Sequence, residues 1–92
     1  MPLLNDEKIS EFLTTLDGWE RIDNKISKTF KTKNFVDTMG FVNKIALLSE
    51  RADHHPDLGV HYSKVVVTLS THSAGGITEK DMNLANEIEQ AR

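Results

Sequence analysis

The sequence predicts an α+β domain in the order α-β-β-α-β-β-α, with a four-stranded antiparallel sheet and helices packed on one face. Three segments show apolar residues at helical spacing, each opened by a residue that commonly caps helices. Two pairs of short strand-like segments separate them. Because these elements fill 92 residues with short connections, we expect a single domain over residues 1–92 and a sheet covered on one side.

Asn5 is expected to cap the first helix and Gly18 to end it. The apolar residues between them follow helical spacing: Ile9, Phe12, Leu13 and Leu16. Strands are predicted over Trp19–Ile22 and Lys25–Phe30. Asp23-Asn24 joins them, a dipeptide that tolerates positive φ and suits a two-residue hairpin turn.

Asn34 should cap the long middle helix, with Asp37 at the reciprocal position of a capping box. The helix should end by about Asp53, because Pro56 disfavours a helical conformation of the residue before it. Its apolar residues form two rows, which are Phe35, Met39, Val42, Ala46 and Phe41, Ile45, Leu48, Ala52. This apolar face is wider than one sheet contact needs. It indicates either a subunit interface or a deeply buried central helix.

The second strand pair is predicted over Val60–Tyr62 and Lys64–Thr71, so that His72 leaves the end of a strand on its more polar side. One face of the second strand is apolar, with Val65, Val67 and Leu69. Gly75-Gly76 then breaks the chain before Thr78 opens the last helix. The apolar residues of that helix are Met82, Leu84, Ala85 and Ile88.

Composition argues against several classes of partner. The chain has 11 Lys and Arg residues and 14 Asp and Glu residues, which gives a net charge of −3, and it contains no basic block. We therefore expect no direct nucleic-acid binding and no membrane association. No apolar run reaches the length of a membrane span and the N-terminus does not resemble a signal peptide, so a cytoplasmic protein is expected. So small a domain without cysteines suggests support by oligomerisation.

Three of the four histidines, His54, His55 and His72, lie within 19 residues of one another. Imidazole has an ordinary pKa of about 6.5, which suits proton transfer near neutral pH, and it is also a metal ligand. Zinc could use His54 and His72 with Asp53 or Glu50. The chain has no cysteine and no H-E-x-x-H spacing, so the pattern favours proton transfer over a metal site.

Two acidic residues have competing interpretations. Glu50 lies one helical turn before His54, so it could orient that imidazole, or it could be a solvated residue beside Arg51. Asp81 is the third residue after Thr78, where a carboxylate completes a capping box. That structural role is favoured over a catalytic one.

The pattern Glu50-x3-His54-His55-Pro56-x5-Tyr62-x9-His72-x8-Asp81 resembles the signature of the pterin-4a-carbinolamine dehydratase family, also called the dimerisation cofactor family. The resemblance extends over nearly the whole chain, including its length and order of elements. Further matching positions are Trp19, Phe30, Phe35, Phe41, Ala46, Ser70, Thr71 and the segment Asp81–Ala85.

The resemblance implies dehydration of 4a-hydroxytetrahydropterin, such as 4a-hydroxytetrahydrobiopterin, to quinonoid dihydropterin without metal or organic cofactor. This substrate is the pterin product of aromatic amino acid hydroxylases, which implies a functional link to such an enzyme. By resemblance, His54 and His72 exchange protons with the pterin and His55 binds and positions it. Supporting positions fall on Glu50, Asp53, Trp19 and Asp81.

The resemblance also implies a homodimer by sheet extension or a homotetramer by helix packing. Two alternatives stay open. Animal relatives stabilise dimers of a homeodomain transcription factor, so the chain could be a non-catalytic binding module. It could also serve another pterin pathway, such as that of molybdopterin. Leu58 and Gly59 stand where aromatic residues often follow His-His-Pro in this family, which bears on pterin side-chain preference.

Overall fold

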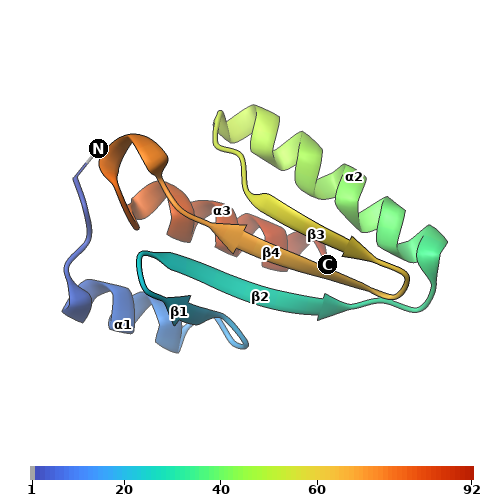
Figure 1. Cartoon of the computed structure of the whole chain (residues 1–92), viewed down its shortest axis with the longest axis horizontal. Coiled ribbons are helices and arrows are strands. Elements are labelled where there is room, and N and C mark those ends of the chain that lie inside the picture. Colours follow the sequence, from blue (N-terminus) through green and yellow to red (C-terminus); the bar gives the residue numbers. More distant parts are fainter. Residues whose placement is uncertain (1) are drawn as a thin grey trace.

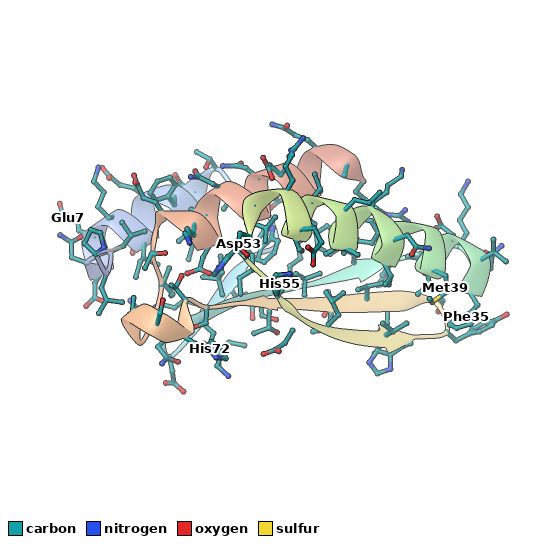
Figure 2. All side chains as sticks on the ribbon, turned by 90° about the horizontal axis from the view of Figure 1, so that it is seen from above. Glu7, Phe35, Met39, Asp53, His55 and His72 are labelled. Carbon is teal, nitrogen blue, oxygen red and sulfur yellow. The ribbon has the colours of Figure 1, made fainter. Side chains whose placement is uncertain are left out.

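The computed structural model describes residues 2–92 and has the predicted order of elements (Figure 1). The helices are α1 (Asp6–Thr14), α2 (Phe35–Ala52) and α3 (Glu79–Ala91), and the strands are β1 (Glu20–Ile22), β2 (Lys25–Lys31), β3 (Asp57–His61) and β4 (Lys64–Leu69). The strands form one antiparallel sheet in the order β1-β2-β4-β3. All three helices lie on one side of it (Figure 2). The predicted α+β class and topology are confirmed.

The core lies between the helices and the two central strands. Ile26 and Phe30 of β2 are buried there, and the predicted apolar face of β4 is buried as well. Side chains from all three helices close this layer: Ile9, Phe41, Ile45, Met82, Leu84, Ala85 and Ile88. Alternation places Ser27 and Thr29 of β2 on the opposite face. Their polarity fits a face that no helix covers.

Polar side chains begin the helices as expected. Asn5 Oδ1 accepts the Lys8 N–H at 2.8 Å, and Asn34 Oδ1 accepts the Asp37 N–H at 2.9 Å. The Asp37 carboxylate accepts the N–H of Lys33 (2.9 Å), so the reciprocal contact falls one residue before the expected one.

Three predicted boundaries were wrong by more than a single residue. Helix α1 ends at Thr14, and Gly18 instead takes a positive φ of 84° in the turn toward β1. Strand β3 begins at Asp57 and not at Val60, because pairing with β4 extends back to it. Strand β4 ends at Leu69, because the backbone of Thr71 pairs with Gly76 (N–O distances of 2.8 and 3.2 Å).

Helix α2 buries only one of its two apolar rows. Phe41 and Ile45 are in the core, whereas Phe35 and Met39 of the other row are 48% and 38% exposed. The interpretation of α2 as a deeply buried central helix is therefore wrong. The exposed row stays a candidate subunit interface. Within residues 2–92, no helix is both long and apolar enough to span a membrane.

Candidate active site

The site begins where α2 ends. Asp53 adopts the left-handed conformation (φ 51°, ψ 44°), and the backbone N–H groups of Asp53 and His54 bond back to the carbonyls of Glu50 (3.2 Å) and Ser49 (3.0 Å). This pattern ends a helix sharply. As a result, the chain turns immediately after Asp53, and the two following histidines point in different directions.

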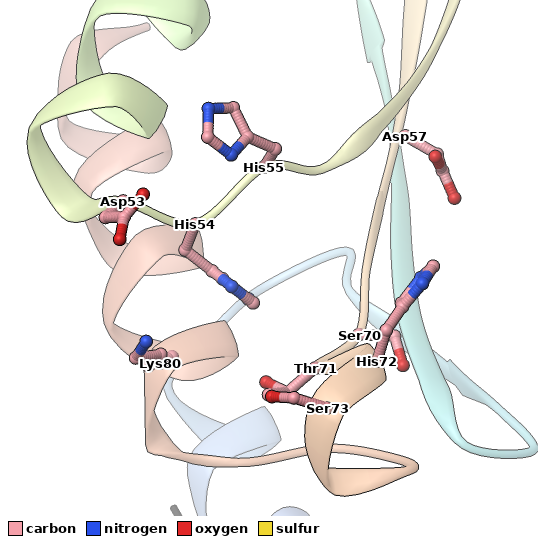
Figure 3. A pocket seen from close by; sticks show the side chains of 9 residues that line it. All are labelled: Asp53, His54, His55, Asp57, Ser70, Thr71, His72, Ser73 and Lys80. Atoms are coloured by element: carbon pink, nitrogen blue, oxygen red, sulfur yellow. The ribbon is translucent and has the colours of Figure 1, made fainter.

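The three histidines of the sequence pattern line one cavity of about 270 Å³. His54 and His55 come from the end of α2, and His72 opens a short 3-10 turn (His72–Ala74) after β4. His54 and His72 lie on opposite sides of the cavity (Figure 3). The complete lining is Asp53, His54, His55, Asp57, Ser70, Thr71, His72, Ser73 and Lys80. The fold therefore brings the strand end to the helix exit, as a shared site requires.

His54 is the most enclosed of the three, with its side chain 10% exposed. Its Nε2 lies 2.6 Å from Oδ1 of Asp81, which is wholly buried in the first turn of α3. Asp81 also completes the predicted capping box, because its Oδ2 accepts the Thr78 N–H at 2.9 Å. Asp81 thus has both of the roles that the sequence set against each other: it caps α3 and it contacts a site histidine.

His55 is paired with Glu50. Its Nε2 lies 3.0 Å from Glu50 Oε1, and both side chains are largely exposed. The expectation that Glu50 would orient His54 was wrong. The left-handed residue Asp53 breaks the helical register, so that His54 no longer lies one turn above Glu50 on the same face.

Asp53 and His72 both line the cavity and are exposed. Among the hydrogen bonds of residues 2–92, none joins Asp53 to an imidazole. Asp53 therefore lines the cavity without orienting a histidine, and its side chain lies beside His54 (Figure 3).

Trp19 lies outside the cavity, although the resemblance places it among the supporting residues. Its side chain is buried in the core, edge-on to Phe30 with ring centroids 6.0 Å apart. Its Nε1–H donates to Glu89 Oε1 at 2.9 Å, and Glu89 also pairs with Lys28. A buried indole needs a partner for its N–H. These contacts account for Trp19 through packing.

The sequence analysis gave no site role to five of the lining residues, which are Asp57, Ser70, Thr71, Ser73 and Lys80, although Ser70 and Thr71 were matching positions of the family pattern. Lys80 could have been expected near the site, because it precedes Asp81, which belongs to the histidine-containing sequence pattern. Thr71 matched the family pattern, but its contact with Asp81 had no signal in the sequence, because the two residues meet across a loop. In the part of the chain that the structure describes, no three His, Asp or Glu side chains are grouped as a metal site.

The fold places this chain in a class of small α+β proteins. Its members have a four-stranded antiparallel sheet with three helices on one face, and here three histidines surround a cavity at one end. The chain belongs to the pterin 4 alpha carbinolamine dehydratase family, whose model matches residues 2–91.

Relatives support this assignment over almost the whole chain. A protein of Picosynechococcus sp. is 47% identical over 95% of both chains, and one of Sulfolobus acidocaldarius is 48% identical over 95% of this chain and 96% of its own. Both carry the name "Putative pterin-4-alpha-carbinolamine dehydratase".

Solved structures share the fold. The transcriptional coactivator/pterin dehydratase of Brucella melitensis superposes with a TM-score of 0.92, at 39% identity over 96% of both chains. A pterin dehydratase-like protein described as a RuBisCO assembly factor of the alpha-carboxysome has a TM-score of 0.64 at 22% identity, over 78% of this chain and 83% of its own. At that identity the second likeness concerns the fold alone.

Proposed function

We propose that this protein dehydrates 4a-hydroxytetrahydropterins, such as 4a-hydroxytetrahydrobiopterin, to quinonoid dihydropterin and water. The observation that carries the proposal is the grouping of His54, His55 and His72 around one cavity in a chain of this family. In the reaction, one proton is delivered to the departing 4a-hydroxyl and one is removed from N5. Imidazoles suit both transfers near neutral pH.

The surroundings of the three histidines suggest different roles. His54 is enclosed and held by Asp81, and His72 stands across the cavity from it, so we assign proton exchange to these two. His55 is exposed and tied to Glu50, which suits binding and positioning of the pterin. The reaction supports tetrahydropterin recycling, and an aromatic amino acid hydroxylase would supply the substrate.

The experiment is dehydration of enzymatically generated 4a-hydroxytetrahydropterin, measured against the spontaneous rate. Wild type should accelerate the reaction clearly, and His54→Ala and His72→Ala should lose most of the acceleration while keeping their circular dichroism spectra. His61→Ala is the matched control, because His61 lies on β3 and outside the cavity lining. A wild-type rate equal to the spontaneous rate would refute the proposal.

A non-catalytic binding role is the second candidate, and the exposed apolar row of α2 favours it. Phe35 and Met39 offer a hydrophobic surface to a partner helix. Substitutions distinguish the dehydratase from the binding module. A binding module would tolerate alanine at all three site histidines, whereas it would lose its partner on substitution of Phe35.

A further inference from the structure

Asp81 is wholly buried and has three hydrogen-bond partners, which fix the plane of its carboxylate. Oδ1 faces His54 Nε2 at 2.6 Å. Oδ2 accepts the Thr78 backbone N–H and the Thr71 hydroxyl, each at 2.9 Å. A buried carboxylate is costly unless such donors surround it, so each contact constrains the other two.

The hydroxyl contacts around Asp81 have a definite direction. A threonine hydroxyl has one hydrogen to donate. Since Thr71 Oγ1 donates to Asp81, its 2.7 Å contact with Thr78 Oγ1 must be donated by Thr78. Thr78 Oγ1 in turn accepts the Lys80 N–H at 3.3 Å. Every hydrogen in this chain therefore points toward Asp81, and hydrogen bonds aligned in this way strengthen one another.

The direction of these hydrogen bonds determines which tautomer of His54 can bond to Asp81. A carboxylate surrounded by donors acts only as an acceptor, so His54 Nε2 must carry a hydrogen and donate it. His54 Nδ1 has no hydrogen-bond partner among residues 2–92. Within the same residues every buried side-chain nitrogen and oxygen has a partner. Nδ1 is therefore in the exposed tenth of the side chain. His54 lines the cavity of the three histidines and also a neighbouring cavity against α3, and the first of these places it beside the other two imidazoles.

The Thr71 contact is not needed to cap α3. The Thr78 hydroxyl and the Asp81 carboxylate complete the capping box between themselves. Thr71 reaches Asp81 from the other side of the loop, where its backbone is held by Gly76. Another buried threonine, Thr38, makes comparable hydroxyl contacts far from the site, at the start of α2, with Thr32 Oγ1 and the Tyr62 carbonyl.

We propose that Thr71 is a positioning residue: its hydroxyl, oriented by Thr78, aims Asp81 so that His54 is held as the Nε2–H tautomer with Nδ1 directed to the substrate. The kinetic consequence rests on the proposed dehydration. The tautomer itself does not depend on it, because it is a property of the free protein.

The test combines ¹⁵N NMR of the His54 ring in ligand-free protein with kcat and KM for dehydration. Wild type and Thr71→Ser should show a protonated Nε2 and a bare Nδ1. Thr71→Val keeps the side-chain volume but should give a mixture of tautomers. It should also lose part of the roughly 10²–10⁴-fold that positioned acid–base groups supply, mainly in kcat. Thr38→Val is the matched control, expected to lose stability while leaving both the ring signals and kcat unchanged.

A protonated Nδ1 in wild-type His54 would overturn the proposal without any variant. The proposal can therefore be refuted even if the Thr71→Val protein fails to fold. Unchanged ring signals in a folded Thr71→Val protein would also overturn it. The proposed function fails separately. A protein without dehydratase activity whose His54 tautomer responds to Thr71→Val would sustain the positioning role and refute only the reaction.

Discussion

The imidazole of His54 and the carboxylate of Asp81 lie 2.6 Å apart (Nε2 to Oδ1), although 27 residues separate them in the chain. The contact joins the end of α2 to the first turn of α3. It couples the capping of a helix to the orientation of a site histidine, so changes at Asp81 should affect both stability and activity.

Asp81→Asn tests this coupling. Two donors face Oδ2, so the amide oxygen of the new side chain should take that place and its NH₂ group should face His54. His54 Nε2 would then have to accept, which moves its hydrogen to Nδ1. We expect kcat to fall by about 10²–10⁴-fold, and the free energy of unfolding to fall by about 1–3 kcal/mol. Urea denaturation and steady-state kinetics measure the two. A kcat close to that of wild type would contradict the role given to Asp81.

The local signals of the sequence were sufficient for the fold. Cap residues such as Asn5 and Asn34, and the alternation along β4, depend on neighbours only a few residues away. The errors arose where distant pairing decides. Strand β4 stops at Leu69 because Thr71 pairs with Gly76, and nothing within the strand indicates that competition.

The site was predicted by its spacing, but its contacts were not. Spacing placed the three histidines together, whereas the partner of Glu50 depended on the left-handed conformation of Asp53. Aspartate adopts that conformation more readily than most residues but does not require it. The contact of Thr71 with Asp81 needs the loop between them to close, which no local pattern encodes.

Asp53→Asn should separate the backbone role of residue 53 from its charge. Asparagine tolerates the left-handed region as aspartate does, so the free energy of unfolding should stay within about 0.5 kcal/mol of wild type. If the carboxylate contacts the pterin in the cavity, KM should rise with little change in stability. Asp53→Val, which is strained at φ 51°, should instead destabilise by about 1–2 kcal/mol. Thermal denaturation and kinetics of the pair distinguish the two effects, and an unaltered KM in Asp53→Asn would remove Asp53 from substrate binding.

Trp19→Phe should lower stability without changing catalysis. Phenylalanine keeps an aromatic ring against Phe30 but leaves Glu89 without the indole N–H. We expect a loss of about 1–3 kcal/mol in the free energy of unfolding, measured by chemical denaturation, with kcat and KM unchanged. A kcat loss comparable to that of His54→Ala would place Trp19 in the site after all.

Phe35→Glu should weaken self-association if the exposed row of α2 is a subunit interface. Phe35 is the first residue of α2, where a negative charge favours the helix, so the fold of the monomer should be kept. Sedimentation equilibrium should give a lower mass for this variant than for wild type. Leu3→Glu, at an exposed apolar residue away from α2, is the control and should keep the wild-type mass. Equal masses for Phe35→Glu and wild type would exclude this row as the interface.

The Asp37–Arg92 pair predicts a pH dependence of stability at the acid end. The Arg92 guanidinium, followed by the backbone N–H of Lys33, lowers the pKa of Asp37 from 3.8 to about 2. Between pH 3.8 and about 2, the Asp37 carboxyl is protonated in the unfolded chain but still ionised in the folded chain. The contribution of the Asp37–Arg92 pair to the free energy of unfolding is therefore complete above pH 3.8 and is lost as the pH falls from 3.8 to about 2. Asp37→Asn should therefore be less stable than wild type at pH 7, and the difference should vanish as the pH approaches 2. Thermal denaturation from pH 7 to 2 tests this, with Arg92→Gln as a second variant that should remove most of the same pH dependence. A difference that persists unchanged at pH 2 would show that Asp37 acts through the shape of its contact with Lys33 and not through its charge.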